Sequence, residues 1–320
     1  MSKPLAKYVW FDGEIVPWEK ATVHVLAHAL HYGTGVFEGI RAYKAEDEVV
    51  VFRLREHIKR MVESAKLYGF DLPYSNEEMC DAVIKLIQKN DFHSSLYIRP
   101  IAFKGVAGIS LDPRPIPTSV SIIAFPFEKY FGSEKLGLNI NVSSWRRIGE
   151  PAVPGIAKAC GHYINSALAR AESGDAGFDE ALFLNSGGNV CEGTGENIFI
   201  VKDQQISTPG LTSGILNGIT RQTVISLIRD WELPFTERDI ARAELYTCDE
   251  AFFTGTAVEV ASVLSIDRKP VGNGKPGPVT MRVKEAYEQT VKGLNSKYLR
   301  YLTPVYGRQQ VVRATSDPNR

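Results

Sequence analysis

Short apolar runs, alternating with segments of helical periodicity, limit the folds that this chain can adopt. The runs at 49–52, 95–103 and 119–127 have strand length and are rich in Val, Ile, Tyr and Phe. Residues 56–68 and 77–89 instead place apolar side chains at helical spacing. No apolar run approaches the length that crosses a membrane. The pattern therefore predicts a mixed α+β chain.

A turn signal lies near the start of the chain. Residues 8–11 and 14–16 are strand-like, and the Asp12-Gly13 pair between them suits a two-residue hairpin. We therefore expect the first strands to be antiparallel.

The length of 320 residues exceeds what one hydrophobic core usually holds, which predicts two domains with a cleft between them. We expect an α/β domain at 1–126, a polar linker at 127–137, a larger domain at 138–306 and a loose polar tail at 307–320. In the larger domain the pattern predicts helices at 164–172, 219–231 and 279–294 and strands at 180–185 and 197–202.

Charge and cysteine usage favour a small-molecule ligand in a reducing compartment. Lys plus Arg and Asp plus Glu number 37 each, without blocks of like charge, so neither a nucleic acid nor a membrane is expected as a partner. The first residues show no secretory pattern and the four cysteines are isolated, which favours the cytoplasm. His24, His28 and His31 lie at helical spacing without a nearby acid, so no metal site is expected.

Lys158 is the only charged residue in the small and apolar stretch 151–161. Desolvation disfavours an ammonium ion, and a neutral amine is the form that attacks an aldehyde to give a Schiff base. The alternative is a surface lysine that extends its head into solvent.

The segment Glu192-Gly-Thr-Gly-Glu-Asn197 offers two carboxylates and an amide beside glycines. A carboxylate held against the ring nitrogen of a pyridoxal cofactor keeps that nitrogen protonated and able to accept charge. The alternative is a polar hairpin with solvated acids.

Residues 214–221 lead directly into a predicted helix, so free N–H groups, the helix dipole and the Thr220 hydroxyl would suit a phosphate. Gly218 is equally suited to be an ordinary capping residue. Residues 254–259 offer a second turn for an anion. Arg60 is either the cation of such a site or a surface arginine.

Tyr97 and Arg99 share one face of an apolar strand, because strand side chains alternate. A buried arginine needs an anion, and either a protein carboxylate or a substrate carboxylate would satisfy it.

Taken together and in this order, these segments resemble the branched-chain amino-acid aminotransferases, which are fold-type IV pyridoxal-phosphate enzymes. The resemblance covers nearly the whole chain and implies a small α/β domain followed by a larger pseudo-barrel domain, with the cofactor between them. It rests on the stretches Trp10–Gly13, His28–Arg41, Arg55–His57, Tyr97–Pro100, Ala157–Ala159, Glu192–Asn197, Gly218–Arg221 and Thr254–Ala257.

The resemblance implies that pyridoxal 5′-phosphate is held as a Schiff base on Lys158, which then moves the proton between the substrate α-carbon and the cofactor. Tyr163 would bind the phenolic oxygen of the cofactor and Glu192 its ring nitrogen. The remaining cofactor-binding residues would be Leu216 and, around the phosphate, Arg60, Ile219, Thr220 and Thr256.

The resemblance also implies amino transfer between L-leucine, L-isoleucine or L-valine and 2-oxoglutarate in one shared pocket. The α-carboxylate would meet Tyr97 and the Thr256-Ala257 turn. The aromatic residues Phe37 and Phe127 would line an apolar side-chain pocket, in which Phe127 stands where a tryptophan is common. The second carboxylate of glutamate would be received by Arg99, Tyr32 and Tyr130.

The family likeness further implies a homodimer or an assembly of dimers, in which the loop 105–110 reaches the active site of the neighbouring subunit. Within the same fold, D-amino-acid transaminases, R-selective amine transaminases and aminodeoxychorismate lyase are the alternatives. A protein that binds the cofactor without catalysis is an alternative of another class.

Overall fold

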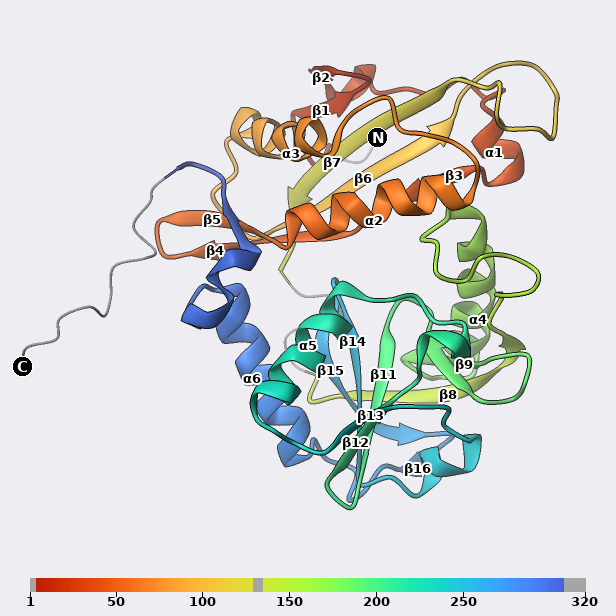
Figure 1. The fold of residues 1–320 in the computed structure, drawn as a ribbon, viewed down its shortest axis with the longest axis vertical. Helices are drawn as coiled ribbons and strands as arrows, with labels where there is room; N and C mark the ends of the chain where they lie inside the picture. The colour runs from red at the N-terminus through yellow and green to blue at the C-terminus, as the bar shows by residue number, and fades with distance from the viewer. Residues whose placement is uncertain (1–3, 129–134, 308–320) are drawn as a thin grey trace, which may run out of the picture.

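The computed structural model describes residues 4–128 and 135–307. Two β-structures lie one above the other in Figure 1, each covered by its own helices. The upper one is formed mainly by the first half of the chain, and the lower one by the second half.

The first sheet is antiparallel throughout, in the order β17-β5-β4-β6-β7-β1-β2, with β3 paired to β6. Helices α2 and α3 contribute their apolar faces to the core of this sheet. These elements are β1 (Tyr8–Phe11), β2 (Glu14–Pro17), β3 (Gly35–Phe37), β4 (Ile40–Ala45), β5 (Glu48–Phe52), β6 (Leu96–Lys104), β7 (Thr118–Pro126), α1 (His28–Tyr32), α2 (Leu54–Leu67) and α3 (Asn76–Asn90).

The predicted hairpin at the start of the chain is confirmed. Asp12 and Gly13 have φ angles of 45° and 97°, and they join β1 to β2 with Phe11 opposite Glu14. A two-residue turn with two positive φ angles matches the twist of antiparallel strands, which is why Asp-Gly is favoured there.

The second sheet closes on itself. The strands run β10-β9-β8-β15-β14-β11, and β10 also pairs with β11, so that six strands form a ring around an apolar interior. The ring strands are β8 (Leu138–Arg146), β9 (Glu180–Leu184), β10 (Val190–Gly193), β11 (Asn197–Lys202), β14 (Glu250–Gly255) and β15 (Glu259–Ile266). The predicted α+β class with a barrel-like second part is confirmed.

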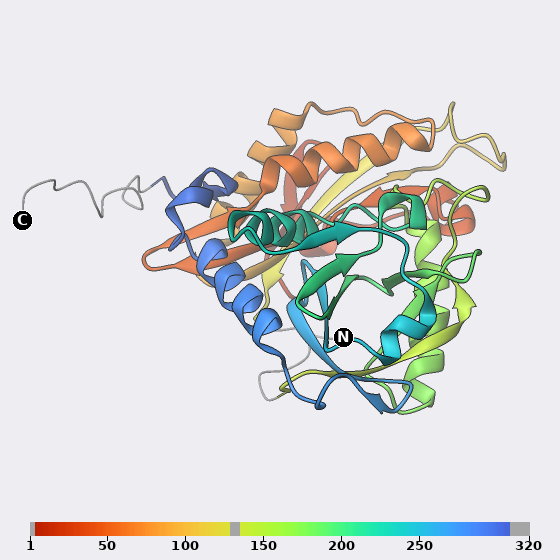
Figure 2. The same cartoon turned by 60° about the horizontal axis from the view of Figure 1, so that its bottom comes forward.

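The other elements of the second half surround this ring (Figure 2). They include all three helices that the sequence predicted there, each within a few residues of its predicted bounds. They are α4 (Tyr163–Asp175), α5 (Ile219–Asp230), α6 (Pro278–Val291), β12 (Gln205–Thr208), β13 (Phe235–Glu237) and β16 (Lys269–Pro270).

The end of the described chain differs from the expected division. The sequence analysis assigned residues through 306 to the second domain, but β17 (Leu302–Pro304) pairs with β5 of the first sheet. A three-residue strand that ends in proline carries too little periodicity to be recognised. Most of the expected linker 127–137 and tail 307–320 lies outside the described residues.

The three histidines that lie at helical spacing do not share a helix, because α1 begins only at His28. Both ring nitrogens of His28 are engaged, with the Thr34 hydroxyl and the Ser110 carbonyl at 2.6 Å each. Within residues 4–128 and 135–307, no group of histidine, cysteine or acidic side chains has the arrangement of a metal site. In the same residues, no helix is long and apolar enough to span a membrane.

Arg53 joins the two halves of the molecule. Its guanidinium donates to the Ile219 carbonyl at 3.0 Å, to the Thr223 hydroxyl at 3.2 Å and to the Gln222 side chain at 3.1 Å. It also lies over the Tyr301 ring. Because these acceptors are on α5, the contact fixes the start of α2 against α5.

Replacing Arg53 by alanine should lower the free energy of unfolding by about 2–4 kcal/mol, because buried acceptors lose their donors and packing is lost. Urea unfolding followed by tryptophan fluorescence measures the loss. Arg55→Ala is the matched control, since that side chain is 77% exposed and lies 3.9 Å from an equally exposed Glu77. Equal losses in the two variants would contradict this role of Arg53.

Candidate active site

A cavity of about 230 Å³ lies between the two halves of the chain. The first half of the chain contributes pocket residues from β3, β6 and α2 and Gly39 between β3 and β4, and the second half contributes the rest. Of the residues that the sequence analysis assigned to the site, those that line the cavity are Phe37, Arg60, Tyr97, Arg99, Lys158, Tyr163, Glu192, Leu216, Ile219, Thr220, Thr256 and Ala257.

The backbone around Lys158 is attached to the first half of the chain. The Phe37 N–H donates to the Lys158 carbonyl at 3.1 Å, and the Lys158 N–H donates to the Ser64 hydroxyl at 3.0 Å. Nearby, Gly161 donates to the Gly33 carbonyl at 3.1 Å. A Cβ on Gly33 would lie 2.8 Å from the Gly161 Cα, so this approach requires glycine. The lysine backbone is therefore fixed against the first half of the chain.

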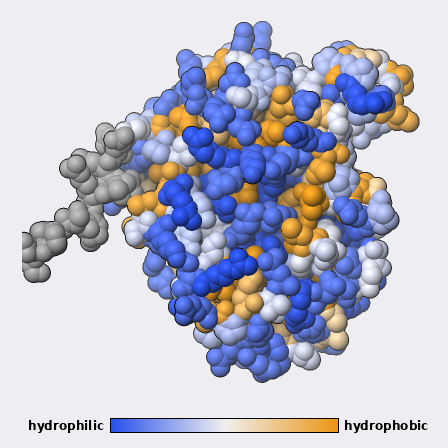
Figure 3. Space-filling view, viewed as in Figure 1, coloured by the Kyte–Doolittle hydropathy of each residue, from blue (hydrophilic) through white to orange (hydrophobic). Residues whose placement is uncertain are grey.

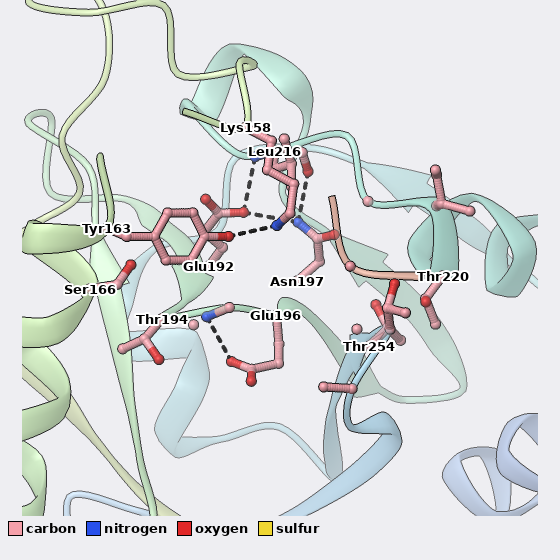
Figure 4. Close-up of a pocket in the computed structure, with 18 of the residues that line it drawn as sticks. Lys158, Tyr163, Ser166, Glu192, Thr194, Glu196, Asn197, Leu216, Thr220 and Thr254 are labelled. Atoms are coloured by element: carbon pink, nitrogen blue, oxygen red, sulfur yellow. Dashed lines mark hydrogen bonds between the residues drawn. The ribbon is translucent and has the colours of Figure 1, made fainter. Parts of the chain in front are cut away.

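The Lys158 side chain extends into the cavity and donates to the Tyr163 hydroxyl at 2.6 Å (Figure 4). Its Nζ lies 4.9 Å from the centre of the Phe37 ring and 5.1 Å from that of Tyr163. The alternative of a lysine head in open solvent is thus wrong, because the amine lies among aromatic rings inside the pocket.

Glu192 is the more firmly bonded of the two acids in its motif. Its Oε1 accepts from Arg147 Nε at 2.7 Å, and its Oε2 accepts from Asn197 Nδ2 at 3.1 Å and from the Leu216 N–H at 2.9 Å (Figure 4). Charge-assisted bonds of this kind hold a carboxylate in one orientation. The alternative of solvated acids is wrong, since Glu192 is only 5% exposed.

Glu196 is buried beside the same cavity but has different surroundings. Its Oε2 accepts from the Gly195 N–H at 3.0 Å. Burial raises the pKa of Glu196 to about 8, and the nearby Glu180 and Glu192 carboxylates act in the same direction. The motif therefore holds one multiply bonded carboxylate and one acid that favours its proton.

The start of α5 is open toward the cavity. Gly218 precedes the helix without a side-chain cap, and Ile219 and Thr220 line the pocket beside Arg60 and Thr256. A Cβ on Gly218 would lie 2.1 Å from the Asn197 side-chain oxygen, so glycine is required there. Free N–H groups at a helix start, with a guanidinium beside them, have the chemistry of a phosphate site.

Three of the residues expected on the substrate side, Phe37, Tyr97 and Arg99, lie on the first sheet. Arg99 donates to the Tyr97 hydroxyl at 2.8 Å and lies over the Phe37 ring, 4.6 Å from its centre. Its buried Nε has no partner, and among the described residues it forms no ion pair. From the sequence, either a protein carboxylate or a substrate carboxylate could pair with Arg99. Among the described residues, no protein carboxylate does so. A Cβ on Gly39 would lie 2.2 Å from the Tyr97 hydroxyl, so glycine leaves room for that side chain.

Three other expected residues are not among the pocket lining. Phe127 lies behind it, with its ring centre 5.4 Å from that of Tyr97. Tyr32 is on α1 with 44% of its surface exposed, and Tyr130 lies outside the described residues. The sequence reasoning missed Arg147, because nothing distinguishes it from the exposed Arg146 beside it.

The cavity fits pyridoxal 5′-phosphate. It combines an amine on a tyrosine hydroxyl, an oriented carboxylate and an open helix start beside an arginine. The buried Thr254 hydroxyl, which also lines it, has no hydrogen-bond partner among the described residues. These groups correspond to the aldehyde, the ring nitrogen and the phosphate of that cofactor.

Residues 35–266 match the amino-transferase class IV family, and the chain belongs to it. The branched-chain-amino-acid aminotransferase of Salmonella typhimurium is 43% identical over 95% of this chain and 99% of that protein. The one from Escherichia coli K12 is 44% identical over 90% of this chain and 94% of that protein. The chain is thus a pyridoxal-phosphate-dependent transferase of the branched-chain type.

Solved structures agree with this assignment. The branched-chain aminotransferase of Thermoproteus uzoniensis, solved with norvaline, superimposes with a TM-score of 0.91 at 47% identity, over 94% of this chain and all of that one. The T.th. branched-chain amino acid aminotransferase, solved with pyridoxamine 5′-phosphate, gives a TM-score of 0.91 at 42% identity, over 94% of this chain and 99% of that one. The predicted family, fold and cofactor are confirmed.

Without cofactor, the contribution of Glu196 to stability should fall as the pH rises from about 4.5 to about 8. In that range the unfolded carboxyl loses its proton while the buried one, with a pKa of about 8, keeps it. Glu196→Gln should therefore be stabilised relative to the wild type at pH 8 but not at pH 4. Urea unfolding at both pH values measures the difference.

Glu63→Gln, at an exposed site on α2, is the control for this experiment and should give the same offset from the wild type at both pH values. An offset for Glu196→Gln that does not change with pH would contradict the raised pKa.

Proposed function

We propose that this chain transfers the amino group of L-leucine, L-isoleucine or L-valine reversibly to 2-oxoglutarate, with Lys158 as the catalytic residue. The observation that carries the proposal is the Lys158 amine, held on the Tyr163 hydroxyl in a pocket that is also lined by Arg99, which has no ion-pair partner among residues 4–128 and 135–307. Those two features supply a group that reacts with an aldehyde and a group that recognises a second carboxylate.

The pocket residues would hold the cofactor at three points. Glu192, oriented by three donors, would bind the ring nitrogen, and Tyr163 would bind the phenolic oxygen. Leu216 would lie against the ring. The phosphate would be bound by Arg60, Ile219, Thr220 and Thr256. When bound, the cofactor supplies a protonated ring that accepts negative charge from the substrate.

Lys158 would move the proton at the substrate α-carbon. When its amine is free, Lys158 would be the base within the pocket. The Tyr163 hydroxyl, 2.6 Å from Nζ, fixes the position of that amine, and the Phe37 ring excludes water from one side of it.

Two kinds of substrate would use the same pocket. Tyr97 and the Thr256-Ala257 turn would meet the α-carboxylate that both kinds share. A branched aliphatic side chain would contact the Phe37 ring, and Phe127 would support this pocket from behind Tyr97. The side-chain carboxylate of glutamate would instead reach Arg99, with Tyr32 and Tyr130 as further donors.

Tyr32 supports a dimeric assembly, because it is exposed away from the pocket of its own chain. Further exposed apolar residues lie on α1, on the segment just before it and on the β6–β7 loop, and apolar colour gathers at the upper right of Figure 3, where these segments lie in Figure 1. They include Val25, Leu30, Val106, Ile109 and Leu111. Apolar surface of this kind favours a subunit contact. We propose a homodimer or an assembly of dimers in which the loop 105–110 meets the pocket of the partner.

A cytoplasmic location is proposed on the cysteine chemistry. Cys80, Cys160, Cys191 and Cys248 are all free. Free cysteines are usual in compartments that keep thiols reduced.

The lysine assignment predicts a spectroscopic result. In the wild type, L-leucine should change the absorbance spectrum of the bound cofactor and 2-oxoglutarate should restore it. In Lys158→Ala neither addition should do so, and turnover should fall on the order of 10³-fold or more, because the attachment point and the base are both lost. Lys202→Ala, at an exposed lysine paired with Asp249, should behave like the wild type.

The other possible outcomes select among the alternatives. A cofactor that responds only to D-amino acids or to amines would indicate one of the related transaminases. Release of pyruvate from aminodeoxychorismate without an amino acceptor would indicate the lyase. A bound cofactor that no amino donor changes would indicate a protein without catalysis.

The dual-substrate pocket predicts a selective loss on substitution of Arg99. Arg99→Leu should lower kcat/KM for L-glutamate about 10- to 100-fold relative to that for L-leucine, because a charge-assisted bond to the second carboxylate is lost. Steady-state kinetics with both donors measure the ratio. Arg146→Leu, at an exposed arginine, should leave the ratio unchanged. An equal loss of kcat/KM for both donors would show that Arg99 does not bind the side-chain carboxylate of glutamate.

A further inference from the structure

Glu38 is a buried acid that the proposed function does not use. It lies between β3 and β4, and its N–H donates to the Pro100 carbonyl at 2.9 Å. Its neighbours Phe37 and Gly39 line the cavity, whereas Glu38 turns away from it and is 0% exposed. A fully buried carboxylate is costly unless charged partners compensate it, so its partners indicate its role.

Those partners are two side chains of α2. Arg60 Nε donates to Glu38 Oε1 at 2.6 Å and Arg60 Nη2 donates to Oε2 at 2.8 Å, which is a two-point contact with one edge of the guanidinium. His57 Nδ1 lies 2.7 Å from Oε2. Arg60 Nη1 donates to the Asn217 carbonyl at 3.1 Å. The guanidinium is thus held in one orientation by both halves of the molecule.

The contact leaves part of Arg60 available. A guanidinium has five N–H groups, and three of them are used by Glu38 and Asn217. The remaining two are on the terminal nitrogens of a side chain that lines the cavity together with Ile219 and Thr220. A fixed fork loses little freedom when an anion binds, which is the general advantage of preorganisation.

The charges of this cluster are balanced without a ligand. Burial opposes ionisation of Glu38, but Arg60 and His57 outweigh it and lower the pKa of Glu38 well below its ordinary value. Burial lowers the pKa of His57, whose Nδ1 is hydrogen-bonded to Glu38. The Glu38 carboxylate lies directly against the Arg60 guanidinium, so an incoming phosphate meets an arginine whose burial is already compensated.

We propose that Glu38 is a positioning residue: it holds the Arg60 guanidinium in the orientation that binds the cofactor phosphate, and His57 holds Glu38. The proposal rests on the proposed role of Arg60 at the phosphate. Glu38 touches neither cofactor nor substrate, so its effect should be confined to ligands that carry the phosphate.

The test compares pyridoxal 5′-phosphate with pyridoxal on the apoenzyme by equilibrium dialysis. Both carry the same aldehyde, so the ratio of their Kd values isolates the contribution of the phosphate. Glu38→Gln removes the charge that orients Arg60. It should lower the preference for the phosphorylated ligand, measured as the Kd of pyridoxal divided by the Kd of pyridoxal 5′-phosphate, by about tenfold or more. Weakening of both ligands by the same factor, or of neither, would overturn the proposal.

Glu237→Gln is the matched control, because it breaks another Glu–Arg contact, the 2.6 Å bond from Arg221 on α5, without touching the pocket lining. It should leave the ratio unchanged. If Glu38→Gln does not fold, Glu38→Asp keeps the buried charge but is one methylene too short for the two-point contact, and the same ratio decides.

Arg60→Met distinguishes the phosphate-binding role of Arg60 from the positioning role of Glu38. If it leaves the ratio unchanged, Arg60 is not a phosphate ligand, and the proposed role of Arg60 fails together with that of Glu38. If it reduces the ratio while the Glu38 variants do not, only the positioning role fails.

Discussion

The backbone junction between β3 and the segment that carries Lys158 is the contact on which the active site depends. Phe37 donates to the Lys158 carbonyl, and the close approach of Gly33 to Gly161 is possible only without side chains. The lysine belongs to the second half of the chain, while the wall opposite its amine belongs to the first. Because main-chain bonds join them, the fold itself places the Lys158 backbone, and the Tyr163 hydroxyl then holds the amine at the end of the side chain.

The sequence predicted the elements with strong local signals and missed those that depend on distant partners. The Asp12-Gly13 hairpin follows from turn chemistry alone. Lys158 was recognisable because no other charge lies near it in the sequence. The return of β17 to the first sheet and the partners of Arg147 and Glu38 depend on residues far away in the chain. No spacing rule identifies such pairs, and for Glu38 the only local signal is an acid between an aromatic residue and a glycine.

The acids of the pocket differ because their donors differ. Glu192 receives an arginine, an amide and a backbone N–H, whereas the carboxyl of Glu196 accepts one backbone N–H and lies near other carboxylates. Donors to both oxygens orient the Glu192 carboxylate, whereas burial and the neighbouring carboxylates raise the pKa of Glu196. Only Glu192 is thus suited to stabilise a protonated ring nitrogen, although both acids come from one six-residue motif.

Three consecutive residues at the end of β3 also differ in the partners that they contact. Phe37 faces the amine and Arg99, Glu38 faces Arg60 on the opposite side, and Gly39 leaves the space that the Tyr97 hydroxyl occupies. Successive residues of an extended chain point in opposite directions, so one short segment contacts the substrate side of the pocket and supports the phosphate side from behind. A shift of this segment along its neighbour β6 would therefore disturb substrate binding and cofactor binding together, which ties both to the register of one strand pair.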